Sequence, residues 1–330
     1  MAWYWPIILG LGSIWGLSFV VSLIWGSELP FLAILLGYLI FAHLYTALFA
    51  KLSRKPGEPV EKHPAYNWPA SGPIGRFGNM WILMTFYPTV MMSVFNPFQL
   101  SQQLRQIVGQ VRAHRRIKRT GSDPAEYQTK VSYHLPLKGE WLVCNGGLTE
   151  ETSHSWGVLA QRYAYDFFKA DAEYRRHSGR GNKLSDYYCY GEDILAAADG
   201  TVVTVLDKIR NAPLVGYGVA DFLCRHFAGN HVVIKHAEGE YGFYAHLIKG
   251  TIQVREGDMV KQGQVIGQCG HSGHSSEPHL HFHLQDTPSL FSSMGLPIRF
   301  CDLRIKENAD SQAASQQAQA IKRGMRVVGD

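Results

Sequence analysis

The segment Glu277-Pro278-His279-Leu280-His281-Phe282-His283 places a histidine at every second position. Side chains two residues apart lie on one face of a β-strand, so this pattern predicts a strand with its imidazoles on one face and Leu280 and Phe282 on the other. Three imidazoles on one face are costly to bury unless they have partners, and a bound cation would be one such partner. A solvated, histidine-rich edge strand is the alternative interpretation.

The N-terminal region is far more apolar than the rest of the chain. Residues Met1–Ser27 carry no charged side chain, and Phe31–Ala50 form a second uncharged run. Each run is long enough to cross a bilayer, and Trp and Tyr near the run ends are typical of interfacial anchors. We therefore expect a transmembrane helical hairpin. A cleaved signal peptide fits poorly because no basic segment precedes the apolar run, and two buried soluble helices are the remaining alternative.

A third uncharged stretch, Phe77–Leu104, is interrupted by Pro88 and Pro97. It predicts a kinked third span, a re-entrant segment or an interfacial segment. Basic residues in short loops favour the cytoplasmic side, which places the loop 51–76 there. Three spans would then put the C-terminal half outside, and we expect this arrangement. Residues 1–104 are thus predicted to be a membrane region with two or three transmembrane helices.

Residues 105–120 are predicted to form a basic amphipathic linker helix. Apolar residues recur at helical spacing from Leu100 to Val111, and the following cations share the segment: Arg105, Arg112, Arg115, Arg116, Lys118 and Arg119. Such a helix is suited to a surface of anionic lipids, although an ordinary solvated helix would show the same pattern. Nucleic-acid binding would depend on this cluster alone, and no recognisable module accompanies it, so we expect no nucleic-acid partner.

Residues 121–304 predict a mainly β domain built on an antiparallel sheet. Short β-branched and aromatic runs end at glycine-containing turns, with no βαβ alternation and no nucleotide-binding loop. The five cysteines form no C-x-x-C pair, which argues against a thiolate zinc site. Residues 305–330 are predicted to be a polar tail.

Several motifs follow one another in this domain. They are Asp166 in an aromatic strand, Ala-Asp-Gly-Thr-Val-Val at 198–203, Gly-Asn-x-Val-Val-Ile-x-His at 229–236, Tyr-Ala-His-Leu at 244–247, the glycine-cornered segment 254–267, and Pro-His-Leu-His-Phe at 278–282. The ordered set resembles the lysostaphin-type (LytM-like) zinc metalloendopeptidases. This resemblance implies a lysostaphin-like peptidase fold for residues 121–304 and hydrolysis of peptide cross-links in peptidoglycan.

The resemblance also implies roles for individual residues. His281, the second histidine of His-Leu-His, and Asp166 correspond to zinc ligands. His246 and His279 correspond to the two histidines that flank the catalytic water and carry general acid–base chemistry.

The third ligand departs from the family pattern. The family usually has a histidine four residues before the Asp, where this chain has Arg162, and a permanent cation cannot coordinate a metal. We expect His154 to supply this ligand from an upstream loop, with His177 as the alternative. His283 replaces a common Glu and is either a partner of the ligands or exposed. The long segments 169–191 and 207–229 are expected to form walls of the substrate groove.

The sequence therefore predicts a membrane-anchored zinc metalloendopeptidase with one Zn²⁺ per chain and with peptidoglycan and a lipid bilayer as partners. We expect a multi-pass protein of the cell membrane whose catalytic domain lies on the extracytoplasmic side. One alternative is a catalytically inactive lysostaphin-like domain that acts as a cell-wall-binding or regulatory module, which Arg162 would favour. A lipoyl- or biotinyl-carrier-like domain is a second alternative, but it leaves the histidines unexplained.

Overall fold

The structure is a computed structural model. It describes residues 5–26, 72–77, 79–121, 124–307, 310–311 and 317–329, together with residues 29, 30, 33, 34, 37, 38, 41 and 45. The chain divides into two compact units, Met1–Lys62 and His63–Asp330, which we describe separately.

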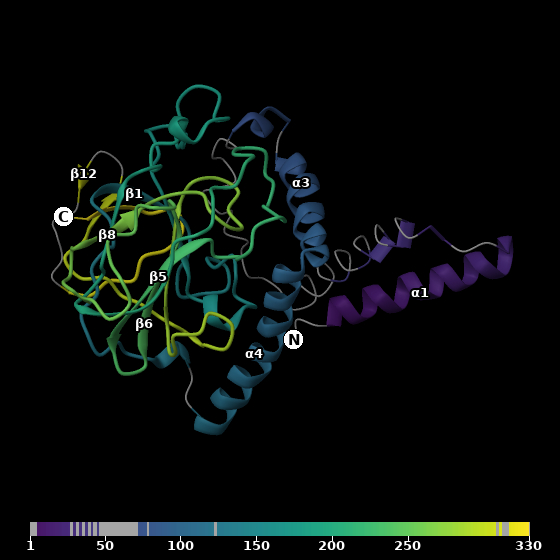
Figure 1. Ribbon diagram of the computed structural model, residues 1–330, viewed down its shortest axis with the longest axis horizontal. Coiled ribbons are helices and arrows are strands. Elements are labelled where there is room, and N and C mark those ends of the chain that lie inside the picture. Colours follow the sequence, from purple (N-terminus) through teal and green to yellow (C-terminus); the bar gives the residue numbers. More distant parts are fainter. Residues whose placement is uncertain are drawn as a thin grey trace. The chain divides into compact units, whose positions relative to one another are not determined.

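Helix α1 (Trp5–Trp25) is the main described element of the first unit (Figure 1). Among the residues that the structure describes, no helix combines the length and apolarity that crossing a bilayer requires. The predicted transmembrane helices are therefore not confirmed, and most of the second predicted span, Phe31–Ala50, lies outside the described residues.

The second unit begins with helical elements. These are the 3₁₀-helix η2 (Pro73–Phe77), helix α3 (Asn79–Met92), the 3₁₀-helix η3 (Ser93–Phe95) and helix α4 (Pro97–Thr120). The third predicted span, Phe77–Leu104, is thus divided among several elements, and α4 begins upstream of the predicted linker boundary at 105. Asn96 caps α4 by accepting a hydrogen bond from the Phe98 N–H at 3.0 Å, and Gly121 ends it in a left-handed conformation.

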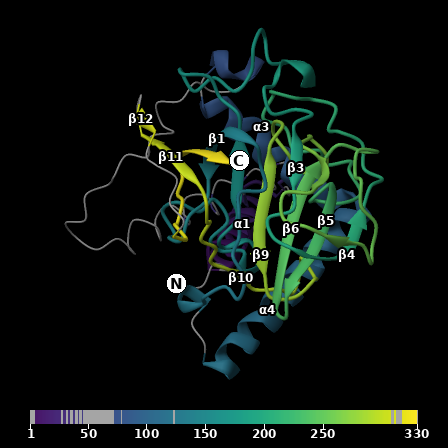
Figure 2. The ribbon, with the colours of Figure 1, turned by 90° about the vertical axis from the view of Figure 1, so that its left-hand side faces the viewer.

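An 11-stranded sheet forms most of the remaining unit, and the strand pairings that make it are antiparallel. Along the sheet the strands are β12 (Asp310–Ser311), β11 (Arg304–Glu307), β13 (Arg326–Gly329), β1 (Gly139–Asn145), β2 (Tyr165–Phe168), β9 (Leu280–Gln285), β6 (Glu240–Leu247), β5 (Asn230–Ala237), β4 (Gly200–Leu206) and β7 (Met259–Val260). Figure 2 shows β9, β6, β5 and β4 running side by side. The predicted mainly antiparallel β domain is confirmed.

Smaller elements complete the unit. Strand β10 (Gly295–Leu296) pairs with β9, and β3 (Asp193–Leu195) pairs with β8 (Val265–Gln268) in a separate two-stranded sheet. Three further 3₁₀-helices are η4 (Pro124–Glu126), η5 (Leu159–Gln161) and η6 (Leu184–Asp186).

Strand β9 shows the alternation that its sequence predicts. Leu280, Phe282 and Leu284 are buried in the main hydrophobic core, which also contains Phe167, Tyr244 and Phe300. His281 and His283 lie between them and are also buried, so the strand is central in the sheet and not a solvated edge. Burial of both faces means that the histidine face must find its partners inside the protein.

The C-terminal segment corrects one prediction. Residues 305–330 are not a polar tail, because β13 pairs with β1 and with β11, and Val327 and Ile321 are buried in the core. The polar composition around 308–319 concealed the short apolar strand β13, which lies between β11 and β1 in the sheet. Two residues of this strand, Val327 and Val328, carry the β-branched signal.

Two buried histidines predict acid sensitivity of the fold. Burial lowers the pKa of His231 to about 4, and burial together with nearby His279 lowers the pKa of His271 to about 3. Both stay neutral in the folded protein while the unfolded chain takes up protons below about pH 6.5, so stability falls as the pH drops below that value. Each of the two histidines should lower the free energy of unfolding by about 2 kcal/mol between pH 6.5 and pH 5.

Urea unfolding of the full chain at the two pH values measures this loss. In His231→Asn an amide can replace the imidazole N–H that faces the Gly229 carbonyl at 2.9 Å, without a group that titrates in this range. We expect a smaller pH dependence for this variant, and equal slopes for both proteins would contradict the assignment.

Candidate metal centre

The sheet register brings the predicted site residues to neighbouring strands. Strand β9 lies between β2 and β6, with His281 directly opposite Asp166 on one side and opposite Ala245 on the other. His246 follows Ala245 at the end of β6 and adopts φ of 65°. A non-glycine residue in this region costs about 1–3 kcal/mol and is found most often at functional sites.

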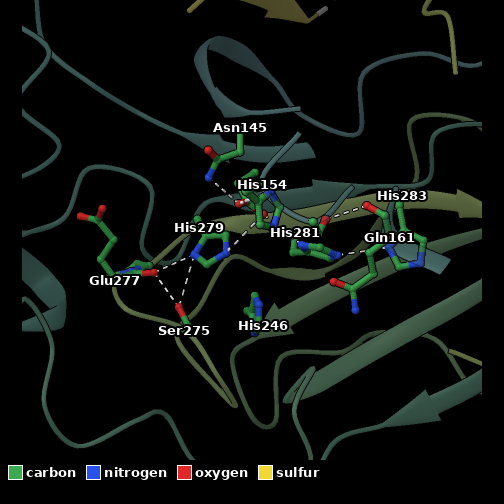
Figure 3. Close-up of polar contacts among 12 residues, drawn as sticks. Asn145, His154, Gln161, His246, Ser275, Glu277, His279, His281 and His283 are labelled. Carbon is green, nitrogen blue, oxygen red and sulfur yellow. Dashed lines mark hydrogen bonds and ion pairs between the residues drawn. The ribbon is translucent and has the colours of Figure 1, made fainter. Parts of the chain in front are cut away.

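The three predicted ligands converge. Each of His154, Asp166 and His281 offers one ligand atom, and these three atoms lie within 4.8 Å of one another. Asp166 Oδ1 is 3.0 Å from His281 Nδ1, and Asp166 Oδ2 is 3.5 Å from His154 Nδ1. Figure 3 shows the side chains of His154, His281, His279 and His246 gathered in one part of the molecule. The predicted convergence of these side chains, which come from separate parts of the chain, is confirmed.

The structure brings His154, and not His177, close to Asp166 and His281. His177 Nε2 accepts a hydrogen bond from the Gly72 N–H at 2.9 Å and its ring packs against Tyr187, so it belongs to the 169–191 segment and not to the ligand cluster. Arg162 stacks its guanidinium over Trp156 at 5.0 Å and donates to the Trp156 carbonyl at 3.3 Å. The arginine that replaces the usual ligand therefore contacts the loop that delivers His154.

Asp166 remains a carboxylate at the centre of the cluster. Burial alone would raise its pKa, but His154, His281 and His279 lower the pKa well below its usual value. Asn145, from the end of β1, donates to Asp166 Oδ2 at 2.9 Å. Asn145 was not singled out from the sequence, where it looks like the first residue of a turn, because a β-bulge places it opposite Asp166.

His246 and His279 present their Nε2 atoms for chemistry. His246 Nδ1 lies 2.7 Å from the Ser272 carbonyl and His279 Nδ1 lies 2.8 Å from the Glu277 carbonyl. A carbonyl only accepts, so each Nδ1 carries a proton and Nε2 is the nitrogen of each ring that is left for proton transfer. The rings are 4.7 Å apart between centroids, and burial together with His279 and His281 lowers the pKa of His246 well below its usual value.

A buried ion pair supports the loop before β9. Arg176 Nε lies 3.1 Å from Glu277 Oε1, and both side chains are about one-tenth exposed. Arg176 also lies over the ring of Phe168, and Phe168 stacks on His279 at 5.0 Å. The insertion 169–191 thus contributes a cation that packs behind His279, a contact that no short-range sequence pattern predicts.

His283 resolves the open question about its own role. It is fully buried, and its Nδ1 lies 3.2 Å from His281 Nε2 while its Nε2 lies 2.9 Å from Gln285 Oε1. Ser293 Oγ donates to the same Gln285 oxygen at 3.0 Å. Burial lowers the pKa of His283 to about 3, so it is neutral at pH 7 and able to accept the His281 Nε2 proton. This orientation directs His281 Nδ1 toward Asp166 as a ligand atom.

Replacing His283 with alanine should therefore weaken zinc binding by about 10–100-fold, because His281 loses the acceptor that fixes its tautomer. His283→Glu restores an acceptor and should recover most of the affinity. Competition with a chelator of known affinity, on the full chain, measures both variants. Wild-type affinity in His283→Ala would show that the contact does not orient His281.

The donor set fits zinc. Two imidazoles and one carboxylate are preferred zinc ligands, and three protein ligands are the number found in catalytic zinc sites, whereas structural sites use four. Zinc–ligand bonds are about 2.0–2.2 Å, so ligand atoms within 4.8 Å of one another can share one ion. Among the described residues this is the one group of histidines, cysteines and carboxylates close enough to hold a metal.

Comparison with known proteins defines the class. Residues 181–291 match the family model of Peptidase family M23. The chain therefore carries an M23 peptidase domain, and glycyl-glycine and peptidoglycan endopeptidases are among the relatives that it matches. His246, His279 and His281 fall inside the matched residues, whereas His154 and Asp166 lie upstream of them.

Two curated relatives illustrate the similarity. The peptidoglycan DD-endopeptidase ShyA of Vibrio cholerae is 36% identical over 94 residues, which cover 28% of this chain and 17% of that protein. The glycyl-glycine endopeptidase ALE-1 of Staphylococcus capitis is 36% identical over 95 residues, which cover 28% of this chain and 23% of that protein. The matched region thus spans less than a quarter of the length of either relative.

Among solved structures, the catalytic domain of lysostaphin from Staphylococcus simulans aligns with 20% identity and a TM-score of 0.27, over 52% of this chain and 90% of that chain.

Proposed function

We propose that this protein is a zinc-dependent metalloendopeptidase that hydrolyses peptide cross-links of peptidoglycan. The observation that carries the proposal is the convergence of His154, Asp166 and His281, with His246 and His279 beside them. The printed names of the curated relatives, a peptidoglycan DD-endopeptidase and a glycyl-glycine endopeptidase, support this substrate class.

His154, Asp166 and His281 would hold the zinc ion. When bound, zinc would act as a Lewis acid and lower the pKa of water to about 7. His246 and His279 supply the proton transfers, because each offers a basic Nε2 whose opposite nitrogen is held by a backbone carbonyl. The Nε2 of one takes a proton from the attacking water, and the other has to carry a proton on Nε2, as an imidazolium, in order to give it to the leaving amine. The carboxylate of Asp166 keeps the ligand set anionic.

Digestion of purified peptidoglycan by the full chain tests this function. Cross-linked peptide dimers should disappear and monomers with new amino termini should accumulate, as measured by liquid chromatography and mass spectrometry. Removing metal with a chelator should stop the reaction, and adding zinc back should restore it. A zinc-loaded, folded protein that releases no peptide would instead indicate a cell-wall-binding or regulatory module.

We also propose that residues 1–104 attach the protein to the cell membrane and that the peptidase domain lies on the extracytoplasmic side. The support is chemical: peptidoglycan lies outside the cytoplasmic membrane, so an enzyme that cuts it has to reach that side. A C-terminal fusion to a reporter that is active only outside the cytoplasm should show activity, and a cytoplasmic reporter at the same position should not.

A further inference from the structure

Helix α4 presents its polar side to the peptidase domain and its apolar side outward. Its buried and half-buried residues recur at helical spacing: Gln99, Gln102, Gln103, Gln106, Gly109, Gln110, Ala113, Arg116 and Ile117. Five of its large apolar residues are between 40% and 55% exposed: Leu100, Leu104, Ile107, Val108 and Val111. A surface helix of a globular protein normally has the opposite arrangement, with the apolar stripe facing the core.

Specific hydrogen bonds hold the helix in this rotation. Gln99 Nε2 donates to the carbonyls of Asp221 and Cys224, each at 2.9 Å. Gln102 Nε2 donates to the Arg225 carbonyl at 2.7 Å. These contacts join the first half of α4 to the insertion 207–229, so that segment supports the helix.

The second half of α4 is held in the same way. Arg116 lies 2.6 Å from Asp286 Oδ2, and Gln110 Oε1 accepts from the Leu159 N–H at 2.8 Å. At Gly109 the helix approaches the Phe291 carbonyl so closely that any side chain would collide with it. Because the polar side is held at both ends, the apolar side cannot turn inward without breaking these contacts.

The exposed apolar surface begins before α4. Met92, Val94 and Phe95 precede the helix and Phe98 lies in its first turn, and all four are between 41% and 64% exposed. Together with the five apolar residues of α4 from Leu100 to Val111 they make a stripe that we call the apolar stripe, residues 92–111. An exposed apolar surface of this length on a folded domain indicates an interaction site.

Cations accompany the apolar stripe, and acidic residues do not. Exposed basic residues of α4 follow or flank it: Arg105, Arg112, Arg115, Lys118 and Arg119. The sequence contains no Asp or Glu between Glu61 and Asp123. Apolar residues combined with cations and no anions are typical of helices that lie in the interface of an anionic bilayer.

We propose that the apolar stripe and the flanking cations of α4 bind the surface of an anionic lipid bilayer. A second copy of this face fits less well, because two such surfaces would bring their arginines together without a carboxylate to neutralise them. The uncharged N-terminal run Met1–Ser27 could cover the apolar residues but would likewise leave the cations unpaired. An anionic lipid surface satisfies both the apolar and the charged residues.

The test places an environment-sensitive fluorescent amino acid at Val108 of the full chain, reconstituted in vesicles that carry a spin-labelled lipid as quencher. A matched protein carries the probe at Met259, an exposed apolar residue of β7. With about a third phosphatidylglycerol in phosphatidylcholine, the probe at 108 should be quenched by about half or more. The probe at 259 should be little changed. About 1 M salt should reduce the quenching because it shortens the Debye length to about 3 Å.

Further variants make the outcome decisive. Replacing Ile107 and Val111 together with Glu should abolish quenching at 108, while circular dichroism and zinc content confirm that the protein is folded. Three results would overturn the proposal. They are the absence of quenching of the probe at position 108, equal quenching in vesicles of pure phosphatidylcholine, and fluorescence of a probe that is already shielded from water when no lipid is present. The last result would identify a second copy if it depends on protein concentration, and the N-terminal segment if it does not. None of these readouts involves peptide hydrolysis, so they are independent of the proposed enzymatic function.

Discussion

Replacing His281 with alanine is expected to remove bound zinc and peptide hydrolysis together. His281 is a predicted ligand at the centre of the sheet, paired across the strands with Asp166 and 3.0 Å from its carboxylate. The substitution removes one of the three predicted ligands and also one of the close polar contacts of the Asp166 carboxylate. The affinity for zinc should fall by more than about 10–100-fold, which is the usual loss when a residue that only contacts a ligand is removed.

Metal analysis after dialysis against a weak chelator, followed by digestion of peptidoglycan, measures both losses on the full chain. His231→Asn is the matched control, since His231 is also buried, on β5, which is separated from β9 by β6, but contacts Phe243 and the Gly229 carbonyl. The control should keep its zinc. Normal zinc content in His281→Ala would show that another residue supplies this ligand.

Replacing His246 with alanine is expected to leave zinc bound while hydrolysis falls by about 10²–10⁴-fold. His246 is outside the ligand cluster, yet its ring lies 4.7 Å from His279 and 5.9 Å from His281 between centroids. Its Nδ1 is held by the Ser272 carbonyl at 2.7 Å, so the basic Nε2 remains for proton transfer. The variant should therefore lose transition-state stabilisation without losing the metal.

The experiment measures the zinc content and the turnover of the same protein sample, and we expect only the turnover to fall. A fall in kcat with little change in KM would indicate a group that acts in the transition state. His279→Ala should show a similar fall, and the double variant should fall by less than the product of the two, because the two residues act as a unit in the same hydrolysis reaction. Unchanged turnover in His246→Ala would remove His246 from the mechanism.

Local patterns in the sequence predicted the central strand well. The alternation across 279–283 places side chains on opposite faces by backbone geometry alone, and the structure has Leu280 and Phe282 in the core while His281 belongs to the ligand cluster. The ordered motifs likewise led to Asp166 and His246. The solvated-edge alternative failed because sheet position depends on partner strands and not on the segment itself.

Contacts made through the fold were harder to predict. The sequence did not identify Asn145, Arg176 or Gln285. A β-bulge places Asn145 opposite Asp166, and Arg176 lies in the insertion 169–191. The contact of Gln285 with His283 was not expected because the role of His283 was still open. The sequence predicted His283 either as a partner of the ligands or as an exposed residue, and its burial in the structure rules out the exposed alternative. The choice of His154 over His177 depended on the path of two loops, which spacing along the chain does not determine.

The same limit applies to helix α4 and to the C-terminus. The basic amphipathic pattern was visible, but the side of α4 that faces the domain depends on glutamines bonded to backbone carbonyls of a distant loop. The strand at 326–329 was predicted to be part of a polar tail because its apolar signal is short and its partner β1 lies far away in sequence.

For this protein the sequence alone determined which residue types were available and how neighbouring side chains alternate, because both follow from local backbone geometry. It also indicated the peptidase class through an ordered series of motifs. Only the tertiary structure decided which atoms meet: Asp166 and His281 are 115 positions apart and become neighbours through the pairing of β2 with β9. That pairing depends on the packing of the whole sheet, and no single segment encodes it.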